Sequence, residues 1–415
     1  MGTALKATTA WNKKFWPTGG EERAFLLVEL TGEAKGTLNN RAPINLSLVL
    51  DRSGSMEGAP LEYSKKACQF AANQLDSHDQ LSIVVFDDQV QTIFAHQNAM
   101  QKTIMKQKIE AIQSGGSTNL SGGLLQGIQH VKHSLEQGSV NRVILLSDGH
   151  ANEGITDRSK LLAIAKEFRG MGIGTSTMGV GDGFDEELMA GLADHGGGNF
   201  YFIAKPEDIP AIFSEELQGL LSVTAQNVEL TINHAEGVTI KQVYGYKSEQ
   251  VEGGLKLSLG DVFEGETKSI LVELSFNPHA VGTHHIFDMQ WNYADVTEGV
   301  KLCSLKHSAE ANFTNDLELL GQTADPHVEK EIKITETAIA IETAIAAFDC
   351  GDEERGIRLL QQQADTMLCA AIQSEDAELR EEAQLLYNQL EGFSYSNYTR
   401  KTLHEKKIRQ MKRKK

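Results

Sequence analysis

Four short apolar runs in the first half of the chain predict a buried sheet. The runs cover residues 44–50, 81–86, 143–146 and 174–180. Their hydrophobic residues follow one another almost without interruption, which is typical of strands that are covered on both faces.

Helical patterns separate these runs. Apolar residues recur every three or four positions, which places them on one face of a helix. The segments with this pattern are 61–75, 120–135, 161–168 and 186–193. Because strands alternate with helices, the sequence predicts a doubly wound, Rossmann-like α/β domain, which we place at residues 42–221.

The period of the apolar residues changes to two in residues 222–315. Alternating apolar positions separated by Gly and Asn turns are typical of an antiparallel β-sandwich. One more strand-like segment, 24–30, precedes the α/β domain. An isolated strand cannot bury its faces alone, so we expect residues 1–41 to contribute a strand to the later sheet. The α/β domain would then be an insertion in the sandwich.

The C-terminal part of the chain is helical in pattern and then strongly basic. Residues 325–392 repeat apolar positions with a helical period, which predicts a helical hairpin or small bundle. The basic tail, 393–415, ends in 17 residues with nine Lys or Arg and a single acid, Glu405. The tail could lie on the acidic body or contact an anionic partner, but we expect a solvated helix end, the usual state of a charge run.

Composition narrows the class of protein. The chain has 415 residues, a formal net charge of −18 and 40% hydrophobic residues. An acidic body disfavours nucleic acid as a partner, and no apolar run reaches the length of a membrane span. The N-terminal residues lack the apolar run of a secretory signal. The four cysteines form no CxxC pair, so we expect mostly buried, reduced thiols and a cytoplasmic location.

The residues that carry chemistry follow the first buried strand. Asp51, Ser53 and Ser55 alternate in sequence, and a turn at Gly54 can point their oxygen atoms at one place. Thr118 precedes a predicted helix, and Asp148 ends another buried strand. Since ligands bind at the carboxyl ends of strands in such sheets, we expect these oxygens to converge. Carboxylates and hydroxyls are hard ligands that suit Mg²⁺ or Mn²⁺.

This set of residues resembles the von Willebrand factor A domain family. The match is Asp51-x-Ser53-x-Ser55, then Thr118, then Asp148 followed by glycine, which are the positions of that family's metal-ion-dependent adhesion site. The placement of the α/β domain between sandwich segments is also similar to cytoplasmic bacterial members that couple this domain to a sandwich and a helical tail. The resemblance covers about half of the chain.

The resemblance implies roles for the five residues. Ser53 and Ser55 would ligate the cation directly, Thr118 directly or through water, and Asp51 and Asp148 through water or hydrogen bonds to the hydroxyls. A cation bound by few carboxylates directly keeps much of its charge. Its vacant position then favours an external carboxylate, an Asp or Glu of a partner protein.

Two other interpretations of Asp51 compete with a metal site. Asp and Ser also cap helices, here one that begins near Pro60. An Asp after the first strand is also the nucleophile of haloacid-dehalogenase-like phosphatases, but the acid expected two residues later is replaced by Ser53. The acids at 182 and 185–187 suggest a second cation site less than they suggest partners of a helix dipole.

The sequence thus predicts a non-enzymatic, Mg²⁺-dependent protein-binding protein that captures an acidic side chain of its partner. The alternative is an accessory subunit of a ring ATPase or of a metal-handling complex. The identity of the partner and the oligomeric state do not follow from the sequence.

Overall fold

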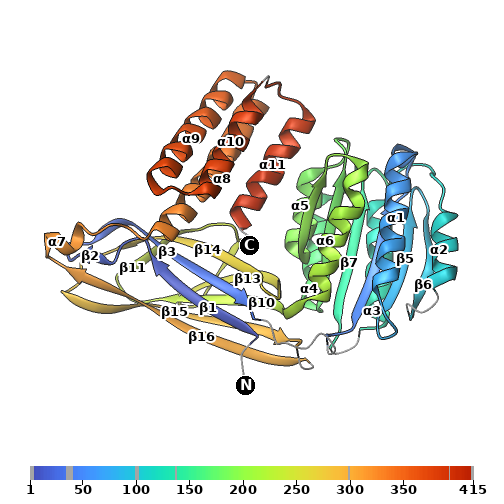
Figure 1. Ribbon diagram of the computed structural model, residues 1–415. Helices are drawn as coiled ribbons and strands as arrows, with labels where there is room; N and C mark the ends of the chain where they lie inside the picture. Colours follow the sequence, from blue (N-terminus) through green and yellow to red (C-terminus); the bar gives the residue numbers. More distant parts are fainter. Residues whose placement is uncertain are drawn as a thin grey trace.

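The computed structural model describes residues 4–33, 41–98, 102–135, 138–297, 300–391 and 393–412. Figure 1 shows an α/β domain, a pair of sheets beside it, and a helical region that lies over both. In the described part of the chain, no helix is both long and apolar enough to cross a membrane.

A six-stranded sheet forms the centre of the α/β domain. In spatial order its strands are β6 (Val90–Asn98), β5 (Gln80–Phe86), β4 (Ile44–Asp51), β7 (Val140–Ser147), β8 (Ile173–Val180) and β9 (Gly197–Ile203). The strands from β5 to β9 run parallel, whereas the edge strand β6 is antiparallel to β5. Only three residues connect β5 to β6, too few for the crossover that a parallel neighbour needs.

Helices cover both faces of this sheet, which confirms the predicted doubly wound α/β domain. One face packs on α1 (Ala59–Gln74), α2 (Lys102–Glu110) and α6 (Ile209–Leu221). The other face packs on α3 (Leu120–His133), α4 (Arg158–Gly170) and α5 (Glu186–Gly196). Strand β4 supplies both cores, since Leu48 and Leu50 point to the first and Val49 to the second.

Two further sheets share a separate hydrophobic core. The first contains β1 (Leu5–Trp11), β3 (Glu21–Gly32), β14 (Thr267–Phe276) and β11 (Val238–Val243), in that order. The second contains β12 (Ser248–Val251), β13 (Gly254–Phe263), β10 (Val223–His234), β15 (Gly282–Asp295), β16 (Lys301–Thr314) and β2 (Phe15–Pro17). The pairing is antiparallel except at β2, a three-residue edge strand parallel to β16.

The N-terminal strands pair with strands from beyond the α/β domain, as expected for residues 24–30. Val28 of β3 lies opposite Ile270 of β14. The end of β3 and the start of β10 are neighbours, because a methyl group added to Gly32 would lie 3.0 Å from Thr224 Oγ1. The chain therefore leaves these sheets and returns to them at nearly the same place.

Helices follow the sheets. A short helix, α7 (Leu317–Leu320), precedes α8 (Pro326–Asp349), α9 (Glu353–Ser374) and α10 (Ala377–Leu390). Asp325, Asp352 and Asp376 cap the N-termini of α8, α9 and α10, because each carboxylate accepts a hydrogen bond from a backbone N–H of the first turn. The helical region predicted at 325–392 is therefore present.

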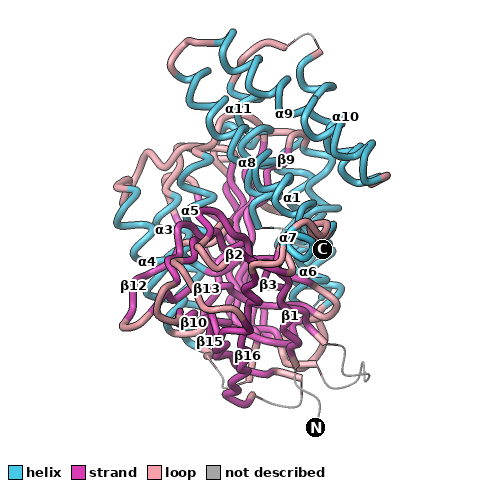
Figure 2. Tube along the Cα trace, turned by 90° about the vertical axis from the view of Figure 1, so that its left-hand side faces the viewer, coloured by secondary structure: helices cyan, strands magenta, loops and turns pink. Residues whose placement is uncertain are grey.

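Up to Lys412 the basic tail is not a solvated helix end, which corrects our expectation, while its last residues, 413–415, lie outside the described part of the chain. Residues Asn397–Lys412 form α11, whose Lys401 and Lys406 are 4% and 3% exposed. The helix lies against α8 and descends to the junction of the three parts of the molecule (Figures 1 and 2). At that end Lys412 pairs with Asp194 of α5 at 2.8 Å. Opposite charge on the body, together with the apolar stems of the lysines, makes burial of this polar helix favourable.

Candidate functional site

The predicted site residues lie at the carboxyl edge of the α/β sheet. Asp51 is the last residue of β4, and Asp148 directly follows β7, its parallel neighbour. Thr118 lies in the turn that leads into α3. Adjacent parallel strands end at the same edge, so their loops meet there.

Hydrogen bonds connect the first two loops. Ser55 Oγ donates to Asp148 Oδ1 at 2.7 Å, and the Ser53 and Ser55 hydroxyl oxygens are 3.2 Å apart. Asp51 is fully buried and accepts from the backbone N–H of Ser53 at 2.8 Å and from the Ser147 hydroxyl at 2.5 Å. These contacts fix the carboxylate of Asp51 behind the hydroxyl groups.

Thr118 completes the cluster from the third loop. A methyl group added to Gly149 would lie 3.1 Å from Thr118 Oγ1 and 3.7 Å from Asp51 Oδ2, so both oxygens border this glycine. The Thr118 backbone N–H donates to Asn152 Oδ1 at 2.9 Å, which holds its turn against the loop after β7. All five predicted residues are therefore brought together.

None of Asp51, Ser53 and Ser55 caps helix α1, so the capping interpretation is wrong. The helix begins at Ala59 with Gly58 at its N-cap position. Ser53 starts only a three-residue 3₁₀ turn, Gly54–Met56, without a side-chain capping bond. The oxygens of the loop point instead toward Asp51 and Asp148.

The electrostatics of the cluster favour a bound cation. Burial raises the pKa of Asp51, against the opposing effect of hydrogen bonds from Ser147 and Ser53. Burial also raises the pKa of Asp148, to about 6, and the charge of Asp51 adds to this effect. Burial, together with the neighbouring carboxylate charge, thus disfavours the charged form of both groups, and a divalent ion would offset this effect.

The donor set fits a hard cation held mainly by hydroxyl groups. The described residues contain no group of three or more His, Cys, Asp or Glu side chains that could hold a metal ion. A site at this edge of the sheet would depend on Ser53, Ser55 and Thr118, with two carboxylates to balance charge. Such oxygen ligands suit Mg²⁺ or Mn²⁺ rather than Zn²⁺.

Sequence reasoning missed two residues that support the site. The Ser147 hydroxyl donates a hydrogen bond to Asp51. Asp87 directly follows the neighbouring strand β5 and is 4% exposed. Arg52 Nε pairs with Asp87 Oδ2 at 3.1 Å, and a methyl group added to Gly115 would overlap the Asp87 carboxylate. The position of Asp87 directly after an apolar strand was the available signal.

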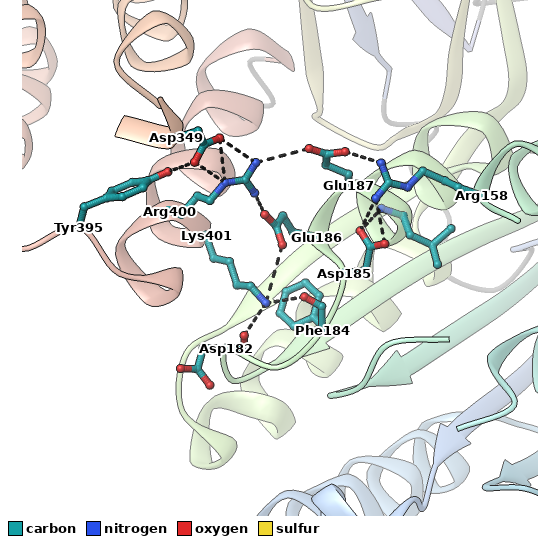
Figure 3. Close-up of polar contacts among 11 residues, drawn as sticks. Arg158, Asp182, Phe184, Asp185, Glu186, Glu187, Asp349, Tyr395, Arg400 and Lys401 are labelled. Carbon is teal, nitrogen blue, oxygen red and sulfur yellow. Dashed lines mark hydrogen bonds and ion pairs between the residues drawn. The ribbon is translucent and has the colours of Figure 1, made fainter. Parts of the chain in front are cut away.

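The acidic residues after β8 form a separate group, and basic side chains of the same chain pair with them. Asp185 caps α5 by accepting from the Leu188 N–H at 2.9 Å. Arg400 of α11 pairs with Glu186 and Glu187, and Arg158 of α4 pairs with Asp185 (Figure 3). Their role at the helix start is as predicted, and their pairing with α11 is new.

The cysteines differ from expectation. Cys68 is buried, Cys303 is partly buried, and Cys350 and Cys369 are exposed. The expectation of mostly buried thiols is therefore wrong.

Comparisons with known proteins agree with this geometry. Residues 45–215 match the family described as von Willebrand factor type A domain. An uncharacterized protein of Synechocystis is 28% identical over 79% of this chain and 79% of its own length. The uncharacterized protein YfbK of Escherichia coli is 28% identical over 62% of this chain, which covers 46% of that protein.

A solved structure extends the similarity to the whole fold. The structure of a von Willebrand factor type A protein from Catenulispora acidiphila superposes with a TM-score of 0.78. It covers 99% of this chain and 97% of its own length at 16% sequence identity. This likeness concerns the fold, since so few residues are shared.

Proposed function

Because the chain belongs to the von Willebrand factor type A domain family through residues 45–215, we propose that it binds a protein partner through a divalent cation at the carboxyl edge of its α/β sheet. Proteins with this domain generally mediate protein–protein interactions. The convergence of Ser53, Ser55 and Thr118 on the buried carboxylate of Asp51 and the partly buried carboxylate of Asp148 supports a specific site for that interaction.

The cation would be held by the hydroxyl groups, and the carboxylates would orient them. Ser55 donates to Asp148, so its lone pairs can face outward, and Asp51 holds the loop from behind. When bound, Mg²⁺ or Mn²⁺ supplies a positive centre that attracts an Asp or Glu of the partner. Ser55 is exposed, and a partner can therefore reach this part of the site from solvent. A desolvated charge pair of this kind contributes strongly to affinity.

Partner capture should depend on both the cation and the serines. We expect proteins retained from lysate by the intact chain in Mg²⁺ to be lost in EDTA and lost with the double variant Ser53→Ala/Ser55→Ala. Captured proteins identified by mass spectrometry provide the measurement. Prey that stays bound under all three conditions would contradict the metal bridge.

We also propose that the chain acts without catalysis. The acid that a haloacid-dehalogenase-like enzyme needs two residues after Asp51 is Ser53, whose hydroxyl lies beside Ser55 instead. Mg²⁺-dependent hydrolysis of a generic phosphoester that disappears in Asp51→Asn would contradict this proposal.

We infer that the two sheets around the shared core are one sandwich into which the α/β domain is inserted. The neighbouring positions of Gly32 and Thr224 support this inference, because inserted domains leave and re-enter their host at adjacent points. A chain in which a short Gly-Ser linker replaces residues 42–221 should still unfold cooperatively. A fragment without a cooperative transition by circular dichroism would count against the insertion.

A cytoplasmic location stays a prediction. Cys350 and Cys369 are exposed free thiols, and exposed thiols persist most readily in a reducing compartment. Alkylation of these cysteines in freshly lysed cells would report whether they are reduced where the protein resides.

A further inference from the structure

The loop between β8 and α5, residues 181–185, borders the candidate metal site. A methyl group added to Gly183 would lie 2.8 Å from the backbone oxygen of Asp148, so the two loops are in close contact. The backbones of Gly183 and Asp148 are too close together for either to move toward the other. A displacement of Gly183 would therefore change the position of the Asp148 loop.

The same loop is anchored to the core by Phe184. This ring is 1% exposed, lies against Gly179 at the end of β8, and contacts Phe200 and Phe202 of β9. Phe184 therefore fixes the C-terminal half of the loop to the core of the α/β domain.

The third contact of the loop comes from the C-terminal helix α11. The ammonium group of Lys401 donates to the backbone oxygens of Asp182 at 2.9 Å and Phe184 at 2.5 Å. It also lies 3.8 Å from the centre of the Phe184 ring, a cation–π arrangement (Figure 3). Lys401 is 4% exposed and is more than 200 residues from the loop in sequence.

Ion pairs hold Lys401 in this position. Its neighbour Arg400 pairs with Glu186 and Glu187 of α5 and with Asp349 at the end of α8 (Figure 3). The Tyr395 hydroxyl also donates to Asp349 at 2.5 Å. Arg400 thus connects the helical region to the α/β domain and presents the next residue, Lys401, to the loop.

We propose that Lys401 is a positioning residue for the candidate metal site. By binding the backbone on both sides of Gly183, its ammonium group fixes the loop on which Asp148 rests. Docking of α11 and occupancy of the site are therefore linked, so each stabilises the other. This proposal rests on the function proposed above, because it assigns a regulatory element to the same site.

Lys401→Met tests the proposal, since methionine keeps the apolar stem and removes the ammonium group. We expect the variant to bind Mn²⁺ roughly 5- to 30-fold more weakly than the parent chain, measured by calorimetry on folded protein. Arg409→Gln is the matched control. Arg409 lies on the same helix, is 56% exposed, and pairs with Glu382 of α10 instead of the α/β domain.

Hydrogen exchange supplies a second measurement that a purely structural role would not change. Linkage is reciprocal, so Mn²⁺ should slow amide exchange in residues 397–412 of the parent chain and of Arg409→Gln, but not of Lys401→Met. Gly183→Ala perturbs the same contact from the other side and should also remove the effect. It serves as the second variant should Lys401→Met fail to fold.

The outcomes separate the two proposals. A parent chain that takes up no Mn²⁺ overturns the proposed function, and this inference with it. A parent chain that binds Mn²⁺ with no change of exchange in α11, and with the same affinity in Lys401→Met, overturns this inference alone.

Discussion

Arg142→Met should lower the free energy of unfolding by about 3–5 kcal/mol, because it leaves a buried carboxylate without its partner. Arg142 lies on β7 of the α/β domain, and its side chain is 1% exposed. Its guanidinium pairs with Asp261 of β13, which is 9% exposed and belongs to the neighbouring sheets. Asp261 also accepts from the Asn227 backbone N–H at 3.0 Å.

Chemical denaturation followed by circular dichroism would measure this loss. The double variant Arg142→Met/Asp261→Asn should recover part of the stability, because it removes the stranded charge. Lys166→Met provides an exposed control, since the side chains of Lys166 and Glu249 are 64% and 65% exposed and such pairs contribute less than about 1 kcal/mol. An Arg142→Met variant as stable as Lys166→Met would show that the Arg142–Asp261 pair does not stabilise the contact between the α/β domain and the neighbouring sheets.

Asp51→Asn should raise the stability of the metal-free protein and weaken its binding of metal. Without metal, the variant should be more stable than the parent chain by roughly 1–2 kcal/mol, because it removes a buried charge near Asp148 and Asp87. The asparagine can still accept from the Ser53 backbone N–H as Asp51 does. With Mn²⁺ at about 100 times its dissociation constant, the parent chain should gain about 2.7 kcal/mol and the variant much less.

Unfolding curves in EDTA and in MnCl₂ would test whether the variant is the more stable protein without metal and the less stable one with metal. Asp288→Asn is the matched control, because it removes the same charge from a side chain that is 70% exposed and lies on β15, outside the α/β domain. An equal Mn²⁺ effect in Asp51→Asn and in the parent chain would remove Asp51 from the site. A variant less stable than the parent chain in EDTA would show that the buried carboxylate is not under electrostatic strain.

Part of the geometry of the candidate site can be predicted from residue spacing. Asp51 and Asp148 follow two of the predicted apolar runs, and parallel strands end at one edge of a sheet, so the common edge of the two carboxylates could be predicted. Asp87 follows a third such run. Its place beside the candidate site became apparent only from its pairing with Arg52 and its contact with Gly115. Residue spacing predicts the edge of the sheet at which a residue lies, but not the residues that it contacts there.

The sequence by itself determined the alternation of strands and helices, the pairing expected of residues 24–30, and the five oxygen-bearing residues at one edge. The first two follow from the period of the apolar positions, which is a local property of the chain. The five residues follow from their oxygen side chains, their places beside the predicted strands and helix, and the resemblance to the von Willebrand factor A domain family. Only the tertiary structure decided the place of α11. It is a mostly polar helix with one buried leucine, Leu403, and its basic side chains pair with acids of α5, α8 and α10 that lie far away in sequence. Attraction between distant charges leaves no period in the sequence, so the contact of Lys401 with the loop beside Asp148 could be found only in three dimensions.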